Sequence, residues 1–160
     1  MSTIRCGIGY DAHRLAEGRR LILGGVAIAH RLGLEGHSDA DVLAHAIADA
    51  MLRAIGAGDI GQHFPNTDES IRGISSIDIL NRVTALLAGR KARVVHVDAT
   101  IIAEAPKIAP HISAMRNSIA AAIGTTESSV SIKATTNEKL GALGRGEGIA
   151  AMAIATVEQG

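Results

Sequence analysis

The sequence has 160 residues, no formal net charge and only two aromatic side chains, Tyr10 and Phe64. Without positive charge to hold phosphates or rings to stack on bases, the protein is not expected to bind a nucleic-acid polymer. Its single cysteine, Cys6, excludes an internal disulfide, and no uncharged apolar run approaches the ~20 residues of a membrane helix. We therefore expect one domain over residues 1–160, in the cytoplasm and without a membrane partner.

The first half of the chain predicts a strand, a hairpin and a long helix. The apolar run over residues 4–10 is typical of a strand, and residues 21–28 indicate a short hairpin that turns at two glycines. A helix is then expected from Ser38, as its N-cap, to about Ile55. Residues 58–68 have no periodicity and are expected to form a loop.

The second half of the chain predicts helices and strands in alternation. Their order is a helix over 75–88, a strand over 94–103, a proline-rich turn over 105–110, a helix to about 123, a strand over 130–135, a glycine-rich loop over 138–148 and a strand over 149–157. Because strands and helices are mixed along one chain, the fold class is α/β or α+β. A core of Ala, Ile, Leu and Val buries less area per residue than an aromatic core, so subunit association would supplement it.

Asp11 and His13 form the first candidate site. They are two residues apart on an extended segment, so their side chains project to the same side at the expected strand end. A carboxylate beside an imidazole suits zinc or a similar divalent metal. A surface ion pair would use the same two residues, so the pair alone leaves both interpretations open.

The long helix adds a possible third ligand. Asp41, His45 and Asp49 are spaced by four residues and lie on one helix face, opposite most apolar positions. With His45 added to Asp11 and His13, three ligands and one open position would be typical of a catalytic zinc. Asp49 or Asp41, one turn away, could orient the imidazole or a substrate hydroxyl. The alternative is a polar helix face in water.

Charge and hydroxyl groups indicate sites for phosphate. Residues 32–71 hold seven acids and one base, a net charge of −6 that suits cations, and the rest of the chain is correspondingly basic. A strand that ends at Thr135 and Thr136 can cradle phosphate with hydroxyl and N–H groups, and Glu138 can hold a hard cation on it. Arg145, between glycines, can reach a phosphate or carboxylate. Ordinary turn chemistry is the alternative for each.

Five motifs in order resemble one known family over essentially the whole chain. They are G-x-G-Y-D-x-H-R at 7–14, G-H-S-D-A-D-V-L-x-H-A at 36–46, G-D-I-G-x-H-F-P at 58–65, A-P-K at 105–107 and K-A-T-T-x-E-K-L-G with G-R-x-E-G-I at 133–149. This pattern resembles the 2-C-methyl-D-erythritol 2,4-cyclodiphosphate synthase family. The resemblance implies a ferredoxin-like α/β sandwich, with a mixed sheet and helices on one face, in a homotrimer with active sites between subunits.

The resemblance also implies a metal-dependent lyase of the non-mevalonate isoprenoid pathway. In the family, the 2-phosphate of 4-diphosphocytidyl-2-C-methyl-D-erythritol 2-phosphate attacks the β-phosphorus, a cyclic diphosphate forms and CMP leaves. The implied zinc ligands are Asp11, His13 and His45, and Glu138 would hold a second cation, magnesium or manganese. His37 and Thr136 would orient the substrate and stabilise the transition state.

The resemblance further implies a set of substrate contacts. They are Asp11, His13, His37, Ser38, Asp59, Ile60, Gly61, Phe64, Pro65, Asn66, Thr67, Asp68, Ala103, Glu104, Ala105, Pro106, Lys107, Ile108, Ala109, Thr135, Thr136, Asn137, Glu138, Ala142 and Arg145. Residues 103–109 would form the cytidine pocket. Asn66 stands where some members carry Asp, and Ala142 where some carry an aromatic residue, which bears on the axial cavity that can hold isoprenoid diphosphates.

Two other functions share parts of this pattern. A zinc-dependent nucleotide phosphohydrolase would use the same metal with water as nucleophile, and would form a ring-free product. Arg145 and the apolar composition would also suit a trimeric module that only binds isoprenoid diphosphates in a central cavity and releases no CMP.

Overall fold

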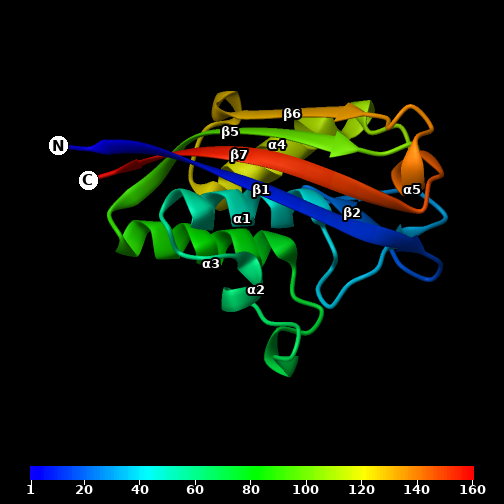
Figure 1. Ribbon diagram of the computed structural model, residues 1–160, viewed down its shortest axis with the longest axis horizontal. Coiled ribbons are helices and arrows are strands. Elements are labelled where there is room, and N and C mark those ends of the chain that lie inside the picture. Colours follow the sequence, from blue (N-terminus) through cyan, green and yellow to red (C-terminus); the bar gives the residue numbers. More distant parts are fainter.

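The computed structural model describes residues 1–160 and is built around one five-stranded sheet (Figure 1). The strand order is β4-β1-β7-β5-β6, and only the β5–β6 pair is parallel. The strands are β1 (Thr3–Ala16), β4 (Gly33–Leu34), β5 (Ala92–Ile102), β6 (Val130–Thr135) and β7 (Gly148–Gln159). A separate hairpin is formed by β2 (Leu21–Leu23) and β3 (Val26–Ile28).

Three long helices cover one face of the sheet, and two four-residue helices lie in the connecting segments. They are α1 (Val42–Ala54), α2 (Ile60–His63), α3 (Ser76–Gly89), α4 (Ile112–Ile123) and α5 (Gly141–Gly144), with 3-10 turns at Glu69–Ile71, Ala109–His111 and Glu127–Ser129. α1 contacts β1 and β7, α4 contacts β6, and α3 packs against both α1 and α4. None of these helices has the length and hydrophobicity needed to cross a membrane.

Most elements expected from the sequence are confirmed. The hairpin, α3, β5, β6 and β7 lie within a few residues of their expected bounds. β1 is longer than expected because β7 pairs with it from Thr3 to Arg14, so Asp11 and His13 lie inside the strand rather than at its end. β4 was not expected, and each of the two expected loops contains a short helix, α2 or α5.

The expectation of a ferredoxin-like subunit is wrong in its chain connections. That fold has the order β-α-β-β-α-β with split βαβ units. Here α1 and α3 follow β1, α4 joins β5 to β6, and β7 comes last. Because β5 and β6 are direct parallel neighbours, their βαβ unit is not split. The mixed sheet with helices on one face is as expected.

α1 lies at the centre of one core of 39 buried residues. Every residue of α1 except His45 and Arg53 is buried, because the sheet covers one side and α3 and α2 cover others. The structure therefore excludes the alternative of a polar helix face in water, since Asp41 and Asp49 are only 0% and 7% exposed.

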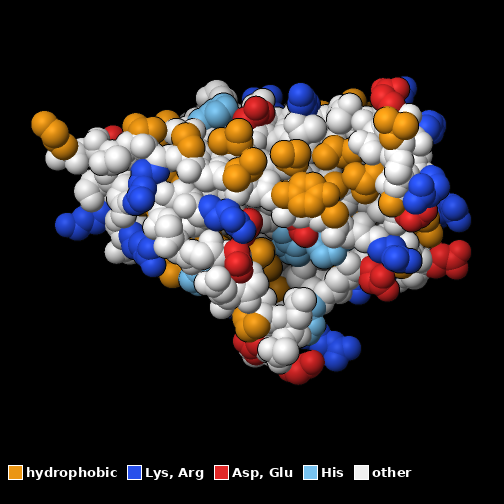
Figure 2. Space-filling view, in the orientation of Figure 1, with side chains coloured by type: hydrophobic (Ala, Val, Ile, Leu, Met, Phe, Trp, Pro, Cys, Tyr) orange, Lys and Arg blue, Asp and Glu red, His pale blue; other side chains and the backbone are white.

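The face of the sheet away from the helices is apolar and open. Its large exposed side chains are Ile4, Ile8, Tyr10, Met152 and Ile154, each between 44% and 60% exposed. Figure 2 shows hydrophobic side chains gathered over β1 and β7 on this surface. A contiguous apolar patch of this kind is typical of a protein–protein contact.

Candidate metal and substrate site

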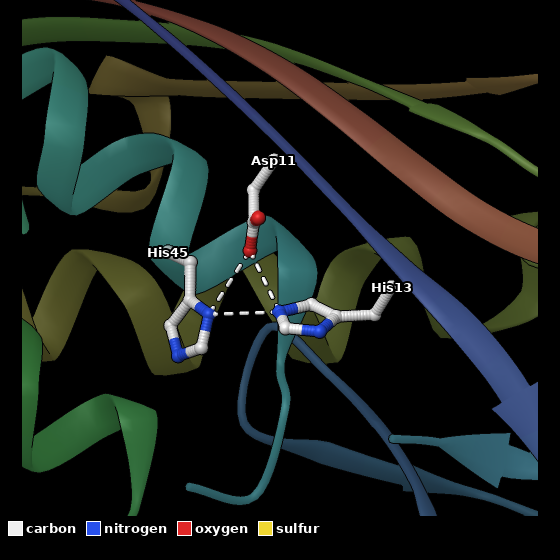
Figure 3. Close-up of side chains that lie close together, drawn as sticks. All are labelled: Asp11, His13 and His45. Atoms are coloured by element: carbon white, nitrogen blue, oxygen red, sulfur yellow. Dashed lines mark hydrogen bonds and ion pairs between the residues drawn. The ribbon is translucent and has the colours of Figure 1, made fainter. Parts of the chain in front are cut away.

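Asp11 and His13 of β1 meet His45 of α1 on the helix side of the sheet (Figure 3). Asp11 Oδ2 lies 2.9 Å from His13 Nε2 and 3.0 Å from His45 Nδ1. The two ring nitrogens are 3.3 Å apart. No other group of three His, Cys, Asp or Glu residues in the chain brings its ligand atoms this close. The structure thus brings together the three residues that the sequence indicated as metal ligands.

Two glycines of β1 allow α1 to lie close enough for this contact. A Cβ at Gly9 would lie 1.9 Å from the carbonyl oxygen of Ala46, and one at Gly7 would lie 2.1 Å from that of Ala50. Any side chain at these positions would push the helix away from the strand. The close approach therefore positions His45 beside Asp11.

The N-cap of α1 is Asp41, and the expectation of Ser38 at this position is wrong. Asp41 Oδ1 accepts the N–H of Ala44, and the chain reaches Asp41 through Ala40, which has a left-handed φ of 58°. Ser38 lies before this turn, where its Oγ accepts the N–H of Ala40 and lies 3.1 Å from His45 Nε2. Both residue types cap helices well, so the sequence alone did not distinguish them.

The outer nitrogen of each imidazole has its own partner. His13 Nδ1 lies 2.7 Å from the carbonyl oxygen of Glu35, which can only accept, so Nδ1 carries the proton. His45 Nε2 lies 2.9 Å from Ser76 Oγ, and Ser76 donates its own proton to Asp39. The Ser76 oxygen therefore accepts from His45 Nε2–H.

These partners determine which atoms face the centre of the cluster. With its proton on the outer nitrogen, each neutral ring turns a lone pair toward Asp11 Oδ2. Three electron-rich atoms at about 3 Å repel one another unless a cation lies between them. The donor set of one carboxylate and two oriented imidazoles fits a zinc-like divalent ion with an open position.

Without a metal ion, a proton between Asp11 and His13 can supply the positive charge. Burial disfavours the charged forms of Asp11 and His13, but their mutual hydrogen bond and attraction outweigh it. The pKa of Asp11, which His45 also lowers, is well below its usual value, and that of His13 is raised. The cluster therefore attracts positive charge, as protons or as metal.

Asp49 does not orient His45. Its carboxylate accepts the Nε–H of Arg53 at 2.8 Å and the backbone N–H of Ile60 at 3.1 Å. The Asp41 carboxylate does not bind the His45 ring either, because its two oxygens accept backbone N–H groups. The contact expected of these carboxylates is made by Ser76. Asp49 instead ties α2 to α1.

The cluster lines a cavity of about 220 Å³, and a hollow with pale blue histidine side chains is visible in Figure 2. The other expected site residues on its wall are His37, Ser38, Ile60, Gly61, Phe64 and Asn66. His37 is half-buried, and its Nε2 lies 3.3 Å from the carbonyl oxygen of Asp68. The wall thus combines metal-binding side chains with apolar and polar contacts for an organic ligand.

A second cavity, of about 310 Å³, lies where β5 and β6 end. Its expected site residues are Ala103, Glu104, Pro106, Lys107, Ile108, Ala109, Thr135 and Thr136. It shares no wall residue with the first cavity. Within one chain, the residues expected to touch a single substrate are therefore divided between two places.

The chain matches the family model of the YgbB family over residues 4–158. It belongs to the YgbB family. Curated relatives include the 2-C-methyl-D-erythritol 2,4-cyclodiphosphate synthases of Alkaliphilus metalliredigens, 58% identical over 98% of both chains, and of Thiobacillus denitrificans, 56% identical over 100% of both.

Solved structures agree with this membership of the YgbB family. The bifunctional IspDF of Campylobacter jejuni has a TM-score of 0.95 and 36% identity, and matches all of this chain but 43% of its own length. IspF of Plasmodium falciparum, in a complex with CDP, has a TM-score of 0.85 and 33% identity, and the match covers 98% of this chain and 96% of that one.

Several expected site residues of this YgbB-family chain are not on either cavity wall. They are Asp59, Pro65, Thr67, Asp68, Ala105, Asn137, Glu138, Ala142 and Arg145. The side chain of Asp59 caps α2 through the N–H of Gln62, and that of Asp68 accepts the N–H of Ser70. Arg145 donates its Nε–H to the carboxylate of Glu147 at 2.6 Å.

Sequence reasoning missed three residues that hold the site. Ser76, at 0% exposure, and Asp39 form the outer contact of His45. Arg19 donates to the carbonyl oxygens of Leu34, Gly36 and Ser38, and so holds the segment that carries His37. No spacing signals these contacts, because the partners of Arg19 and Ser76 come from distant parts of the chain.

Proposed function

We propose that this protein converts 4-diphosphocytidyl-2-C-methyl-D-erythritol 2-phosphate to 2-C-methyl-D-erythritol 2,4-cyclodiphosphate with release of CMP. One observation carries the proposal: Asp11, His13 and His45 converge in a cavity also lined by His37 and Ser38. The chain is also 58% identical over 98% of its length to a synthase of this name. The reaction is a lyase step that forms an isoprenoid precursor.

Repulsion between two phosphates is the main obstacle to this reaction. An oxygen of the 2-phosphate attacks the β-phosphorus, and the bond from that phosphorus to CMP breaks, with its electron pair leaving on CMP. Two unit charges ~4 Å apart repel by about 4 kcal/mol at an effective dielectric of ~20. When bound, zinc at Asp11, His13 and His45 and magnesium or manganese at Glu138 would act as Lewis acids on the phosphates.

The chain's own residues would mainly orient the substrate. The nucleophile is part of the substrate and is already deprotonated, so no general base is needed and positioning supplies much of the rate. The contact with the Asp68 carbonyl anchors the His37 ring in the cavity wall, and Thr136 Oγ1 lies 3.3 Å from Glu138 Oε1. These contacts support His37 and Thr136 as residues that orient phosphate and stabilise the transition state.

Residues 103–109 would bind the cytidine of the substrate. The second cavity lies at this segment and has no aromatic residue on its wall. Main-chain groups would therefore recognise the base without ring stacking, which agrees with two aromatic residues in the whole chain. In the first cavity, Asn66 would contact substrate through an amide.

The proposed assembly is a homotrimer with each active site between two subunits. The metal cluster and the Thr135–Thr136 end of β6 line separate cavities, so a neighbouring copy would complete the site. The open apolar face of β1 and β7 supports such packing. An axial cavity near Arg145 and Ala142 would be the place for an isoprenoid diphosphate.

A metal analysis beside a CMP-release assay tests the function. The purified protein should hold one zinc per chain and form the cyclic diphosphate together with CMP. His45→Ala should lose both zinc and turnover, whereas the control His30→Ala, at a histidine outside both cavities, should keep them. A ring-free product would indicate a phosphohydrolase. A protein that releases no CMP would instead fit the module that only binds isoprenoid diphosphates.

Two further measurements test the second cation and the trimer. Glu138→Gln should weaken the dependence of turnover on magnesium or manganese, and an unchanged titration would contradict the assignment. Light scattering at micromolar protein should report three chains. A monomer mass would contradict an active site shared between subunits.

A further inference from the structure

We propose that Glu104 is a positioning residue whose carboxylate holds residues 136–140 in the conformation that presents Thr136 and Glu138 to the substrate. The resemblance places Glu104 among the cytidine contacts, whereas its side-chain contacts are all with this loop. The inference rests on the proposed function for the role of the loop, and on the structure alone for the restraint.

The carboxylate of Glu104 is fully engaged by the loop. Its Oε1 accepts the backbone N–H of Asn137 at 2.9 Å and of Lys139 at 3.2 Å. Its Oε2 lies 2.9 Å from Lys139 Nζ. The Glu104 side chain is only 7% exposed, whereas that of Lys139 is 81% exposed. A carboxylate enclosed in this way needs these partners and has little surface left for a ligand.

The two backbone bonds flank the proposed cation ligand. Glu138 lies between Asn137 and Lys139, so its backbone is held on both sides by one oxygen of Glu104. Glu138 and Lys139 both have left-handed φ values, 50° and 63°. Residues with a Cβ rarely adopt this conformation, and it persists where surrounding contacts impose it. Glu104 supplies such contacts.

The contacts of Glu104 with residues 136–140, called the clamp below, also connect the two halves of the proposed substrate site. Glu104 belongs to the segment proposed for cytidine, and the loop carries the residues proposed for the diphosphate. Next to the clamp, the N–H of Ala103 donates to the carbonyl oxygen of Thr135 at 2.9 Å. The two segments are thereby held at one separation, which suits a nucleotide whose base and diphosphate are covalently linked.

The charge on Glu104 is secured by the same partners. The Lys139 ammonium lowers the pKa of Glu104, burial opposes this, and the N–H groups of Lys139 and Asn137 lower it further, so the pKa lies below its usual range. The carboxylate is therefore ionised at neutral pH. The sequence predicted that N–H groups of this loop could cradle phosphate, and two of them are bound to Glu104 instead.

Three variants and one control separate the contributions. Glu104→Ala removes every contact, Glu104→Gln keeps an oxygen that accepts the two N–H groups, and Lys139→Met keeps both backbone bonds but loses the ion pair. The control is Glu127→Ala, at a glutamate paired with Arg116 outside both cavities. Amide hydrogen exchange is measured on the substrate-free full chain, and kcat and KM in the CMP-release assay.

Glu104→Ala should speed exchange at the Asn137 and Lys139 amides by about tenfold or more, and leave the Ile132 amide of β6 unchanged. Its kcat should fall by about tenfold while KM changes less than about threefold, because positioning acts on the reacting groups. Glu104→Gln should recover most of the protection and rate. Lys139→Met and Glu127→Ala should stay within about threefold of the original kcat.

Other results would overturn the proposal. Unchanged exchange at both amides in Glu104→Ala would exclude the clamp. Faster exchange with unchanged kcat would exclude its role in turnover, and a raised KM at unchanged kcat would indicate direct cytidine contact instead. If the unmutated protein releases no CMP, the proposed function is wrong. Hydrogen exchange then still shows whether Glu104 restrains residues 136–140. If Glu104→Ala does not fold, Glu104→Asp takes its place with the same expected results, because its shorter side chain draws the carboxylate away from the N–H groups of Asn137 and Lys139.

Discussion

Asp41 connects the hairpin to the start of α1, and Asp41→Ala should destabilise the fold strongly. Its side chain is 0% exposed and accepts three backbone N–H groups, from Gly24 at 2.9 Å, Gly25 at 2.7 Å and Ala44 at 3.0 Å. Alanine would remove the partner of all three donors, and those of Gly24 and Ala44 are buried. His45 lies one helical turn after this cap, so the position of the candidate metal ligand His45 depends on Asp41 as well.

The expected loss is about 4 kcal/mol. Removing an N-cap costs about 1 kcal/mol, and each further hydrogen bond to a charged group contributes about 1.5 kcal/mol or more. Burial raises the pKa of Asp41, and this cost of desolvation limits the net stabilisation. With a urea dependence near 2 kcal/mol per M, the unfolding midpoint should fall by about 2 M.

Urea unfolding followed by far-UV circular dichroism measures this loss, because the chain has no Trp for fluorescence. One protein concentration and a metal chelator remove contributions from assembly and metal binding. Asp41→Asn should lower the free energy of unfolding by about 2 kcal/mol. Its amide oxygen can still accept from some of the N–H groups, but its NH2 group would lie against another donor. The control Asp78→Ala, at an exposed residue of α3, should lose less than about 1 kcal/mol. A loss below about 1 kcal/mol for Asp41→Ala would refute the reasoning.

Three more predictions concern the metal cluster. Gly9→Ala should lower the free energy of unfolding, measured by thermal unfolding, by about 3 kcal/mol and should lower the zinc content, because its Cβ would lie 1.9 Å from the Ala46 oxygen. The control Gly89→Ala, with open space around it, should change neither quantity, and equal behaviour of the two variants would contradict this reasoning. Ser76→Ala should weaken zinc binding by about tenfold or more in competition with a chelator, and unchanged affinity would exclude its role behind His45. The raised pKa of His13 means that a proton occupies this ligand until the pH exceeds that pKa, so zinc affinity measured by calorimetry should fall as pH decreases from about 8 to 6. A flat profile would contradict it.

Much of the architecture could be predicted from local sequence signals. The bounds of β6 follow from a β-branched run, and α3 begins after its expected N-terminal Ser75. The trio of Asp11, His13 and His45 was also predictable, because spacing along one strand and one helix indicates which side chains share a direction. These signals depend on residues within a few positions of one another.

The connections between distant segments were not predictable in this way. Ser38 and Asp41 are equally good caps by type, and the N–H groups of the hairpin at Gly24 and Gly25 favour Asp41. The polar positions of α1 left open whether they bind a metal or face water, and packing of the sheet and helices around this helix excludes the second. The expected chain connections of the sheet were wrong for the same reason, since strand order is decided by long-range pairing.

The sequence by itself determined which residues can bind a metal, where most helices and strands lie and which family motifs the chain carries. Only the tertiary structure decided the partners of those residues: Ser76 rather than Asp49 for His45, and the loop of Glu138 for Glu104. The physical reason is that a buried polar atom must find a hydrogen-bond partner, and which atom lies within reach depends on packing between segments far apart in the chain.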